Sequence, residues 1–260
     1  MKFKYFFVPL VFISLLFSCK KDKEESYGKI QFNFKFQVNG TTLKTDTIMY
    51  TNAAGNPYMI NNIQYFLTNI KLHNSNGGVF QLSKDGFSRY IDSDIPSTLS
   101  WLVSDEIPEG TYNAITFTFG IKSSQNKSNM FVNPPESGMW WPDMLGGGYH
   151  YMKLNGKWLP PSQTIGNPFN THLGIGRVID NNTSDTTFVD NSFEGTINTA
   201  NLIINNETHI LNFIMNIDSW FKTPNVYNFD IDGAAIMENQ KAMQKIKENG
   251  FDVFRIEVLN

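Results

Sequence analysis

The sequence predicts an all-β fold, mostly an antiparallel β-sandwich, with one late C-terminal helix. Three observations support this. Apolar and polar residues alternate with a period of two through much of the chain, Asn- and Gly-rich turns separate the alternating stretches, and 22 phenylalanines supply a large aromatic core. No repeat of fixed period and no Pro/Ser-rich linker divides the chain, so we expect a single β domain over residues 29–260.

The strands follow from the alternation. In the stretch IQFNFKFQV, residues 30–38, every even position is apolar and the odd interior positions are polar. Because successive side chains of a strand point to opposite faces, this pattern indicates a half-buried strand and not a helix. Further strands are expected over residues 62–72, 111–119, 149–154 and 209–217, and turns at residues 38–40, 73–78, 109–110 and 155–156. The Asn-Gly pairs at 39–40 and 155–156 are typical hairpin formers.

One segment breaks the alternation and predicts the helix. Over residues 233–249, Ile236, Met243 and Ile246 recur at helical spacings, the basic residues come late, and Gly250 follows directly. Late basic residues and a following glycine are signals of a helix C-terminus. Alternation then resumes in a final strand.

The N-terminus predicts export and a lipid anchor. Residues 1–18 have a short basic start and an apolar run, which is shorter than the roughly 20 residues of a membrane-spanning helix but has the length of a signal-peptide core. The run ends in Leu16-Phe17-Ser18-Cys19, which contains the single cysteine and resembles the bacterial lipobox. That resemblance implies a lipoprotein signal peptide over residues 1–18, with Cys19 lipidated and a flexible tether over residues 19–28.

The tether carries the charged run KKDKEE at residues 20–25. The run lacks apolar residues, as disordered segments do, and resembles the signal that sends some Bacteroidetes lipoproteins to the cell surface. We therefore expect an outer-membrane lipoprotein on the periplasmic or the cell-surface face, with the surface favoured. The membrane partner is the lipid on Cys19, and the sequence identifies no protein partner.

Charge and motifs argue against two functional classes, nucleic-acid-binding proteins and enzymes. Loss of Lys2 and Lys4 with the signal peptide changes the formal charge from −3 to 19 − 24 = −5, which gives no electrostatic reason to bind nucleic acid. No HExxH, GxSxG, P-loop or Cys/His zinc spacing occurs, and no nucleophile–base pair is evident. We therefore do not expect an enzyme.

Three of the four histidines are candidate metal ligands. His150 shares a face of its expected strand with Met152, His209 shares a face with Met215, and His172 precedes a glycine-containing strand end. A structural histidine is the simpler interpretation of each one alone. Taken together they suggest a shared site, and imidazole with thioether sulfur is a ligand set that favours copper.

The stretch MWWPDMLGGGYHYMK, residues 139–153, surrounds one of these histidines. Its glycines, Gly146–Gly148, would let the backbone turn sharply into the strand that bears His150. Met139, Trp140 and Trp141 would then be accessory residues that shield a metal site. Two alternatives remain open: the tryptophans could plug one end of the sandwich, or they could form a platform on which a sugar stacks.

The order of "VNG", "INNIQYFLTNIKLHNSNG", "FTFGI", "MWWPDMLGGGYHYMKLNGKW" and "THLG" resembles the MbnP-like copper-binding domain family, from Lys29 to the C-terminus. Many of its members are lipid-anchored Bacteroidetes proteins. The resemblance implies a β-rich domain that binds copper through histidines, with His150 and His172 matching recurrent histidines and His209 placed by its strand face. In some relatives a tryptophan oxidised to kynurenine contributes; the Trp-x-His spacing of that site does not occur here.

The leading hypothesis is therefore a non-catalytic lipoprotein that captures or buffers copper in the cell envelope. It requires His150, His172 and His209 to approach within about 4 Å of a common point, because metal–nitrogen bonds are about 2 Å long. It also predicts that affinity falls as the pH drops through about 6.5, where imidazole becomes protonated. The alternative is a non-metal interaction module for a glycan or a protein, with Trp140 or Trp141 exposed.

Overall fold

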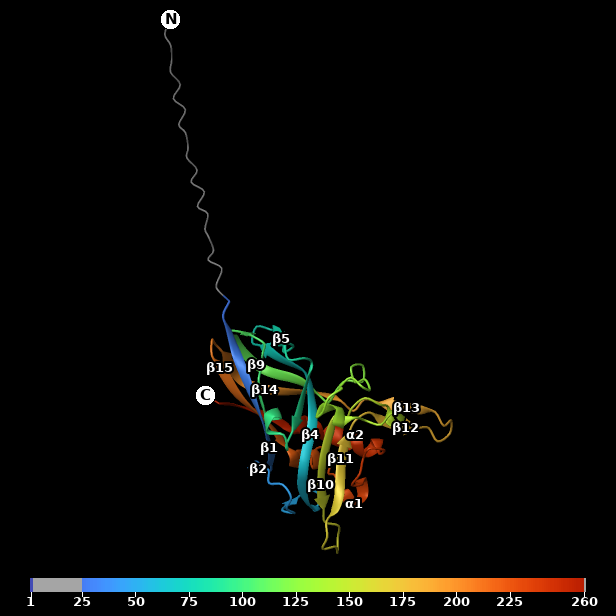
Figure 1. Ribbon diagram of the computed structural model, residues 1–260. Coiled ribbons are helices and arrows are strands. Elements are labelled where there is room, and N and C mark those ends of the chain that lie inside the picture. Colours follow the sequence, from blue (N-terminus) through green and yellow to red (C-terminus); the bar gives the residue numbers. More distant parts are fainter. Residues whose placement is uncertain (2–24, 260) are drawn as a thin grey trace.

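The structure is a computed structural model that describes Met1 and residues 25–259, so the expected signal peptide, Cys19 and most of the expected tether lie outside the described residues. Two packed sheets form the body of the domain (Figure 1). The six-stranded sheet contains β1 (Tyr27–Val38), β2 (Thr41–Thr42), β7 (Ser100–Leu102), β8 (Ile107–Pro108), β15 (Thr208–Asn216) and β16 (Phe254–Leu259).

The eight-stranded sheet positions the candidate site. It contains β3 (Tyr50–Thr51), β4 (Pro57–Asn74), β5 (Val79–Gln81), β6 (Ser88–Asp92), β9 (Gly110–Phe119), β10 (Met152–Trp158), β11 (Asn167–Leu173) and β14 (Phe193–Ile204). Its main path runs β11-β10-β4-β9-β14, and a separate hairpin is formed by β12 (Gly176–Ile179) and β13 (Thr186–Val189). The predicted mostly antiparallel sandwich is confirmed, with one parallel pair, β1 and β15.

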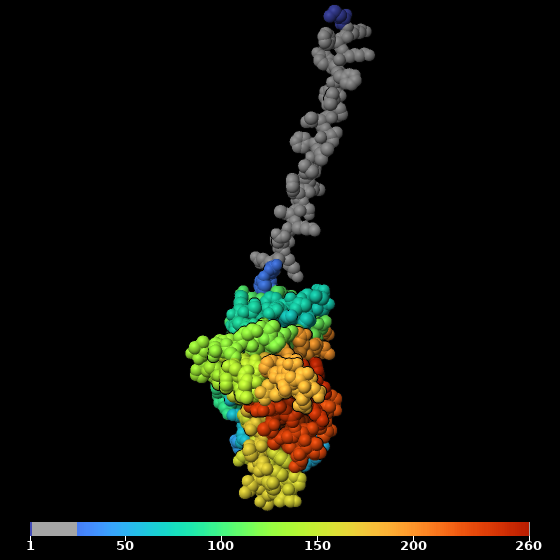
Figure 2. Space-filling view, turned by 90° about the vertical axis from the view of Figure 1, so that its right-hand side faces the viewer, coloured from blue at the N-terminus to red at the C-terminus, as the bar shows by residue number. Residues whose placement is uncertain are grey.

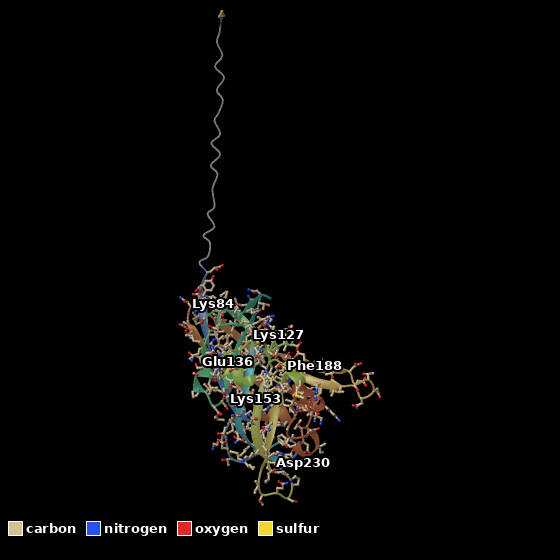
Figure 3. All side chains as sticks on the ribbon, turned by 45° about the vertical axis from the view of Figure 1, so that its right-hand side comes forward. Lys84, Lys127, Glu136, Lys153, Phe188 and Asp230 are labelled. Atoms are coloured by element: carbon tan, nitrogen blue, oxygen red, sulfur yellow. The ribbon has the colours of Figure 1, made fainter. Side chains whose placement is uncertain are left out.

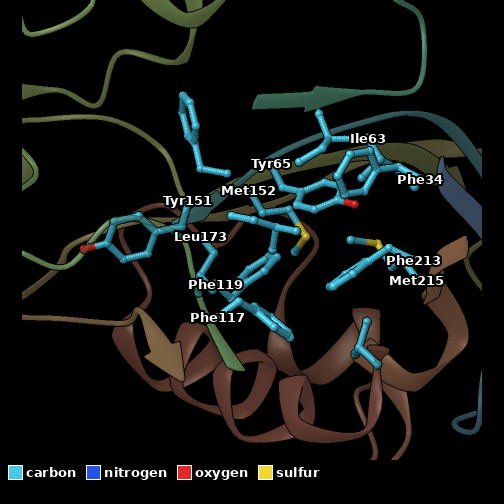
Figure 4. Close-up of a cluster of buried hydrophobic side chains, with 14 of the residues drawn as sticks. Phe34, Ile63, Tyr65, Phe117, Phe119, Tyr151, Met152, Leu173, Phe213 and Met215 are labelled. Atoms are coloured by element: carbon cyan, nitrogen blue, oxygen red, sulfur yellow. The ribbon is translucent and has the colours of Figure 1, made fainter. Parts of the chain in front are cut away.

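The core lies between the two sheets and is mainly aromatic. On β1 the even-numbered residues are buried, as the alternation predicted. Phe213 of β15 contacts Phe117 of β9 at a ring-centroid distance of 5.2 Å, and Phe36 of β1 contacts Tyr65 of β4 at 6.3 Å. Figure 4 labels Phe213, Phe117 and Tyr65 in this cluster. Each such ring contributes about 1.5–3 kcal/mol when fully buried, so these contacts hold the sheets together.

One expected turn forms and another does not. Asn39 and Gly40 have φ of 50° and 76° and join β1 to β2, as a tight hairpin requires. Asn155-Gly156 instead lies inside β10, where the register with β4 shifts. A Cβ on Gly156 would come within 2.0 Å of the Met59 carbonyl oxygen, so this glycine permits a close approach of two strands and not a turn.

The helical part is shorter than predicted. Helix α2 (Gln240–Asn249) begins after Asn239, whose side chain accepts a hydrogen bond from the Ala242 N–H, and the only other α-helix of the described residues is the single turn α1 (Phe229–Asp232). Gly250 has φ −58° and is not a left-handed cap. A Cβ there would lie 2.2 Å from the Phe193 ring, so close packing explains this glycine.

Short 3₁₀ helices connect the larger elements: η1 (Pro96–Thr98), η2 (Glu136–Met139), η3 (Asp143–Leu145), η4 (Ile217–Phe221) and η5 (Gly250–Asp252). No helix of the described residues is long and apolar enough to cross a membrane. Figure 2 shows the segment around residues 125–150 beside the β12–β13 hairpin on one face of the domain. The two are joined there by a hydrogen bond from the Arg177 side chain to the Met144 carbonyl.

Candidate metal centre

A long segment between β9 and β10 covers part of the outer face of the eight-stranded sheet. Phe131 in this segment stacks on Phe66 of β4 at 5.2 Å, and its N–H donates to the Tyr149 hydroxyl at 2.9 Å. The segment ends in Gly146, Gly147 and Gly148, whose φ values of 114°, 68° and 81° are accessible mainly to glycine. The expected sharp turn before His150 is therefore present.

The two neighbouring tryptophans have different environments. Trp141 is fully buried and donates its indole N–H to the Leu145 carbonyl at 3.2 Å. Its ring lies so close to Gly174 that a Cβ on that residue would approach it to 2.6 Å. Trp140 is 47% exposed, whereas Met139 is fully buried. Trp141 and Met139 thus lie in the interior of the protein, whereas Trp140 faces solvent.

His150 is 4% exposed, and one carbonyl fixes its orientation. The Met139 carbonyl oxygen accepts from the His150 backbone N–H at 2.7 Å and lies 2.9 Å from its ring Nδ1. Because a carbonyl oxygen only accepts, Nδ1 carries the ring hydrogen and Nε2 is the unprotonated nitrogen. That Nε2 is buried without a hydrogen-bond partner.

His172, on β11, has a free nitrogen for a similar reason. Its Nε2 lies 2.8 Å from Oδ1 of Asn155, and the amide nitrogen of Asn155 donates to Asn62 Oδ1 at 2.8 Å. Asn155 therefore presents an acceptor, which places the hydrogen of His172 on Nε2. The unprotonated Nδ1 of His172 is buried and has no hydrogen-bond partner.

The two imidazoles are adjacent, with ring centroids 5.1 Å apart and planes at 81°. Trp141 packs against His150 at a centroid distance of 4.7 Å, although nine positions separate the two residues in the chain. The two rings are therefore in contact although the sequence contains no Trp-x-His spacing. The predicted strand over residues 149–154 begins only at Met152, so alternation does not place the His150 ring.

Burial keeps both rings neutral. Desolvation, then the charge of Lys153 and then His172, lower the pKa of His150 from 6.5 to about 3. Desolvation and then Lys153 lower the pKa of His172 to about 4. Neutral imidazole is the form that binds metals. Both pKa values lie below the 6.5 of free imidazole, so we expect protonation of this pair only in more acidic solution than the sequence alone suggested.

These residues fit a metal ion that needs few protein ligands. A buried polar atom without a partner is costly, and here two such nitrogens belong to adjacent rings. Since metal–nitrogen bonds are about 2 Å long, an ion bound to both rings requires the two free nitrogens to lie within about 4 Å of each other. Within residues 25–259 no group of three or more His, Cys, Asp or Glu side chains is placed to hold a metal. The available donor set is a pair of neutral imidazoles.

His209 lies apart from this pair. It is opposite Ile30 at the start of β15, in the six-stranded sheet, and its Nε2 accepts from the Asn205 N–H at 3.2 Å. His73, on β4, lies 2.8 Å from the Thr116 hydroxyl. The expected three-histidine site is therefore reduced to two residues, because a strand face does not specify which sheet the strand joins.

Two residues near the pair were not expected from the sequence. Lys153 is directly opposite His172 in the β10–β11 register, and its Nζ donates to the Gly138 carbonyl at 2.7 Å. Figure 3 shows Lys153 midway along the domain, below Glu136. Asn155, two residues further along β10, fixes the His172 ring. In β10, Lys153 and Asn155 lie on the other face of the strand from the buried residues Met152 and Leu154, so the alternation does identify them as polar positions. The residues that they contact depend on the tertiary structure.

Comparison with known proteins gives a family and a fold. The MbnP family profile matches residues 27–242. The structure is similar to that of MbnP from Methylosinus trichosporium, with a TM-score of 0.57 and 11% sequence identity, over 89% of this chain and 99% of that one. At this identity the similarity concerns the fold alone. A search of curated protein sequences gave no match.

Proposed function

The chain belongs to the MbnP family, which is associated with copper, and we propose that it is a cell-envelope lipoprotein that binds copper through His150 and His172. It would capture or buffer the ion without catalysis. The observation that carries this proposal is the adjacent pair of neutral imidazoles, each with a buried nitrogen that no group in the described part of the chain occupies.

The surrounding residues support this assignment. The Met139 carbonyl and the Asn155 amide fix which nitrogen of each ring is free, a role that residues behind metal ligands commonly have. Trp141 is fully buried and packs against the ring of His150, which is only 4% exposed. Imidazole is a suitable copper ligand, and the low proton affinity of both rings removes competition from protons.

The test is the copper content of a chain from Ser26 to Asn260 after exposure to copper and desalting. We expect near-stoichiometric copper in the parent and none in the His150→Ala/His172→Ala variant. A His73→Ala/His209→Ala variant is the matched control and should keep its copper. Loss of copper only from the control variant, or equal copper in all three proteins, would refute the assignment. Peptide masses from the same samples show whether Trp141 is tryptophan or kynurenine.

Export and anchoring are proposed from the N-terminal sequence. A lipid on Cys19 would hold the protein in the outer membrane, with the cell surface favoured over the periplasmic face. Cys19→Ser should then release the protein from membranes into a soluble form. Membrane association that survives this substitution would contradict the lipid anchor.

A second candidate is the non-metal interaction module, and the exposure of Trp140 favours it. Trp140, Met144 and Phe188 are 47%, 68% and 53% exposed. An exposed indole can stack on a sugar or pack against a partner protein. If the parent protein takes up no copper, this candidate becomes the leading one, and Trp140→Ala should then abolish retention on a glycan array or by a partner.

A further inference from the structure

Lys153 places a positive charge beside both candidate ligands. It is opposite His172 in the β10–β11 register, and the hydrogen bond from Nζ to the Gly138 carbonyl holds its amine against the loop. The next residue of that loop, Met139, supplies the carbonyl that orients His150. The charge of Lys153 acts on His150 and on His172.

The two candidate ligands supply no negative charge to offset this cation. The two donors are neutral imidazoles, and the described residues contain no cluster in which a carboxylate or thiolate joins them. An ion held there is therefore repelled by Lys153 without compensation from an anionic ligand. Coulomb repulsion is proportional to the charge of the ion, so a divalent ion experiences twice the free-energy penalty of a monovalent one.

We propose that Lys153 is a specificity-determining residue of this site and makes it select monovalent over divalent ions. The inference rests on the proposed function, since it concerns the same two histidines. The site thus favours Cu(I) over a divalent ion, because a monovalent ion experiences half the repulsion.

The test measures affinities of the purified protein for Ag(I), a monovalent probe that is not reduced or oxidised during the titration, and for Zn(II). In Lys153→Met the repulsion is removed, and the logarithm of the Zn(II) affinity should rise by twice as much as that of Ag(I). A tenfold gain for Ag(I), about 1.4 kcal/mol, would accompany about a hundredfold gain for Zn(II). Lys153→Arg keeps the charge and should keep the parent ratio of affinities.

A matched control is Lys157→Met, which removes an exposed lysine of the same strand and should change neither affinity. If Lys153→Met fails to fold, Lys153→Gln provides the same loss of charge with a polar side chain. Equal gains for the two ions, losses of both, or Zn(II) binding that stays absent in every variant would overturn the role of Lys153.

Failure of the proposed function has a different signature. In that case the parent and the His150→Ala/His172→Ala variant would bind Ag(I) equally, and the inference about Lys153 would fall with it. If Ag(I) binding depends on the two histidines but the ratio of the Ag(I) and Zn(II) affinities does not change in the Lys153 variants, only the inference about Lys153 fails.

Discussion

The pair His150–His172 and the single residue His209 place the same side chain in two different surroundings. His150 lies near the end of the segment that joins β9 to β10, His172 lies beside it on β11, and each keeps one buried nitrogen without a partner. His209 lies at the start of β15, and its Nε2 is occupied by the Asn205 N–H. The two surroundings differ in whether a buried ring nitrogen is left without a partner, and neither the residue type nor its strand face predicts this.

The largest expected effect is on the free energy of unfolding, and it comes from Trp141, which packs against His150. Trp141→Ala should lower the free energy of unfolding by about 3–5 kcal/mol, because it removes a fully buried indole from contact with His150 and Gly174. Trp140→Ala removes a half-exposed ring and should cost less than about 1 kcal/mol. Urea denaturation of both variants measures the difference. Equal losses of stability in the two variants would mean that Trp141 does not stabilise the packing around His150.

Acid should destabilise the domain through the pair. In the unfolded chain both histidines take up protons below about pH 6.5, whereas the buried rings, with pKa values of about 3 and about 4, do not. The unfolded state then binds more protons, so stability falls as the pH decreases from about 6.5 towards 4, by up to about 1.4 kcal/mol per pH unit for each histidine.

Urea denaturation at pH 7 and pH 5 tests this dependence, with His172→Asn as the comparison because it removes one titrating ring and keeps an amide donor. The decline should be shallower in the variant. Copper uptake by the parent should persist at pH 5. An unchanged slope in the variant would contradict the neutral, buried state of His172.

Loss of the hydrogen bond that orients the His172 ring should have a smaller effect, which we expect in the copper affinity. Asn155→Ala removes the acceptor that fixes the His172 ring, and residues behind metal ligands typically contribute about 10-fold or more to affinity. We expect copper affinity to fall by about tenfold, as measured by competition with a chelator. Asn170, which is opposite Asn155 on β11, provides the control: Asn170→Ala should retain the parent affinity.

The smallest effect is expected at His209. His209→Ala removes the acceptor of the Asn205 N–H and should cost about 0.5–1.5 kcal/mol of stability. Copper affinity should change by less than about twofold. A tenfold loss of copper would remove the distinction between His209 and the pair, and would require a ligand set different from the one proposed here.

The sequence predicted the strands well because alternation is a local property. The stretch from Ile30 to Val38 specifies which residues face the core, and β1 buries those residues. The role of Asn155-Gly156 was not predictable in the same way. The sequence alone does not distinguish a glycine that leaves room for a neighbouring carbonyl from a glycine that forms a turn.

The sequence predicted only part of the candidate site, because some of its contacts join residues that are distant in the chain. His150, His172 and Trp141 came from the motifs that surround them, and the structure brings the three together. The free nitrogens depend on Met139 and Asn155, whose contacts with the rings form only in the folded chain. Lys153 is near the rings because β10 and β11 pair in one particular register, which no local pattern specifies.

The parallel pairing of β1 with β15 affects when the domain can be completed as the chain is made. Strand β1 is the first described strand of the chain, and on one side its partner is Thr208–Asn216, nearly 180 residues later. Until that distant segment has been synthesised, the phenylalanines of β1 and one edge of its backbone are open to other chains. The six-stranded sheet therefore cannot be completed before almost the whole chain is present, and a chain that ends before β15 should aggregate.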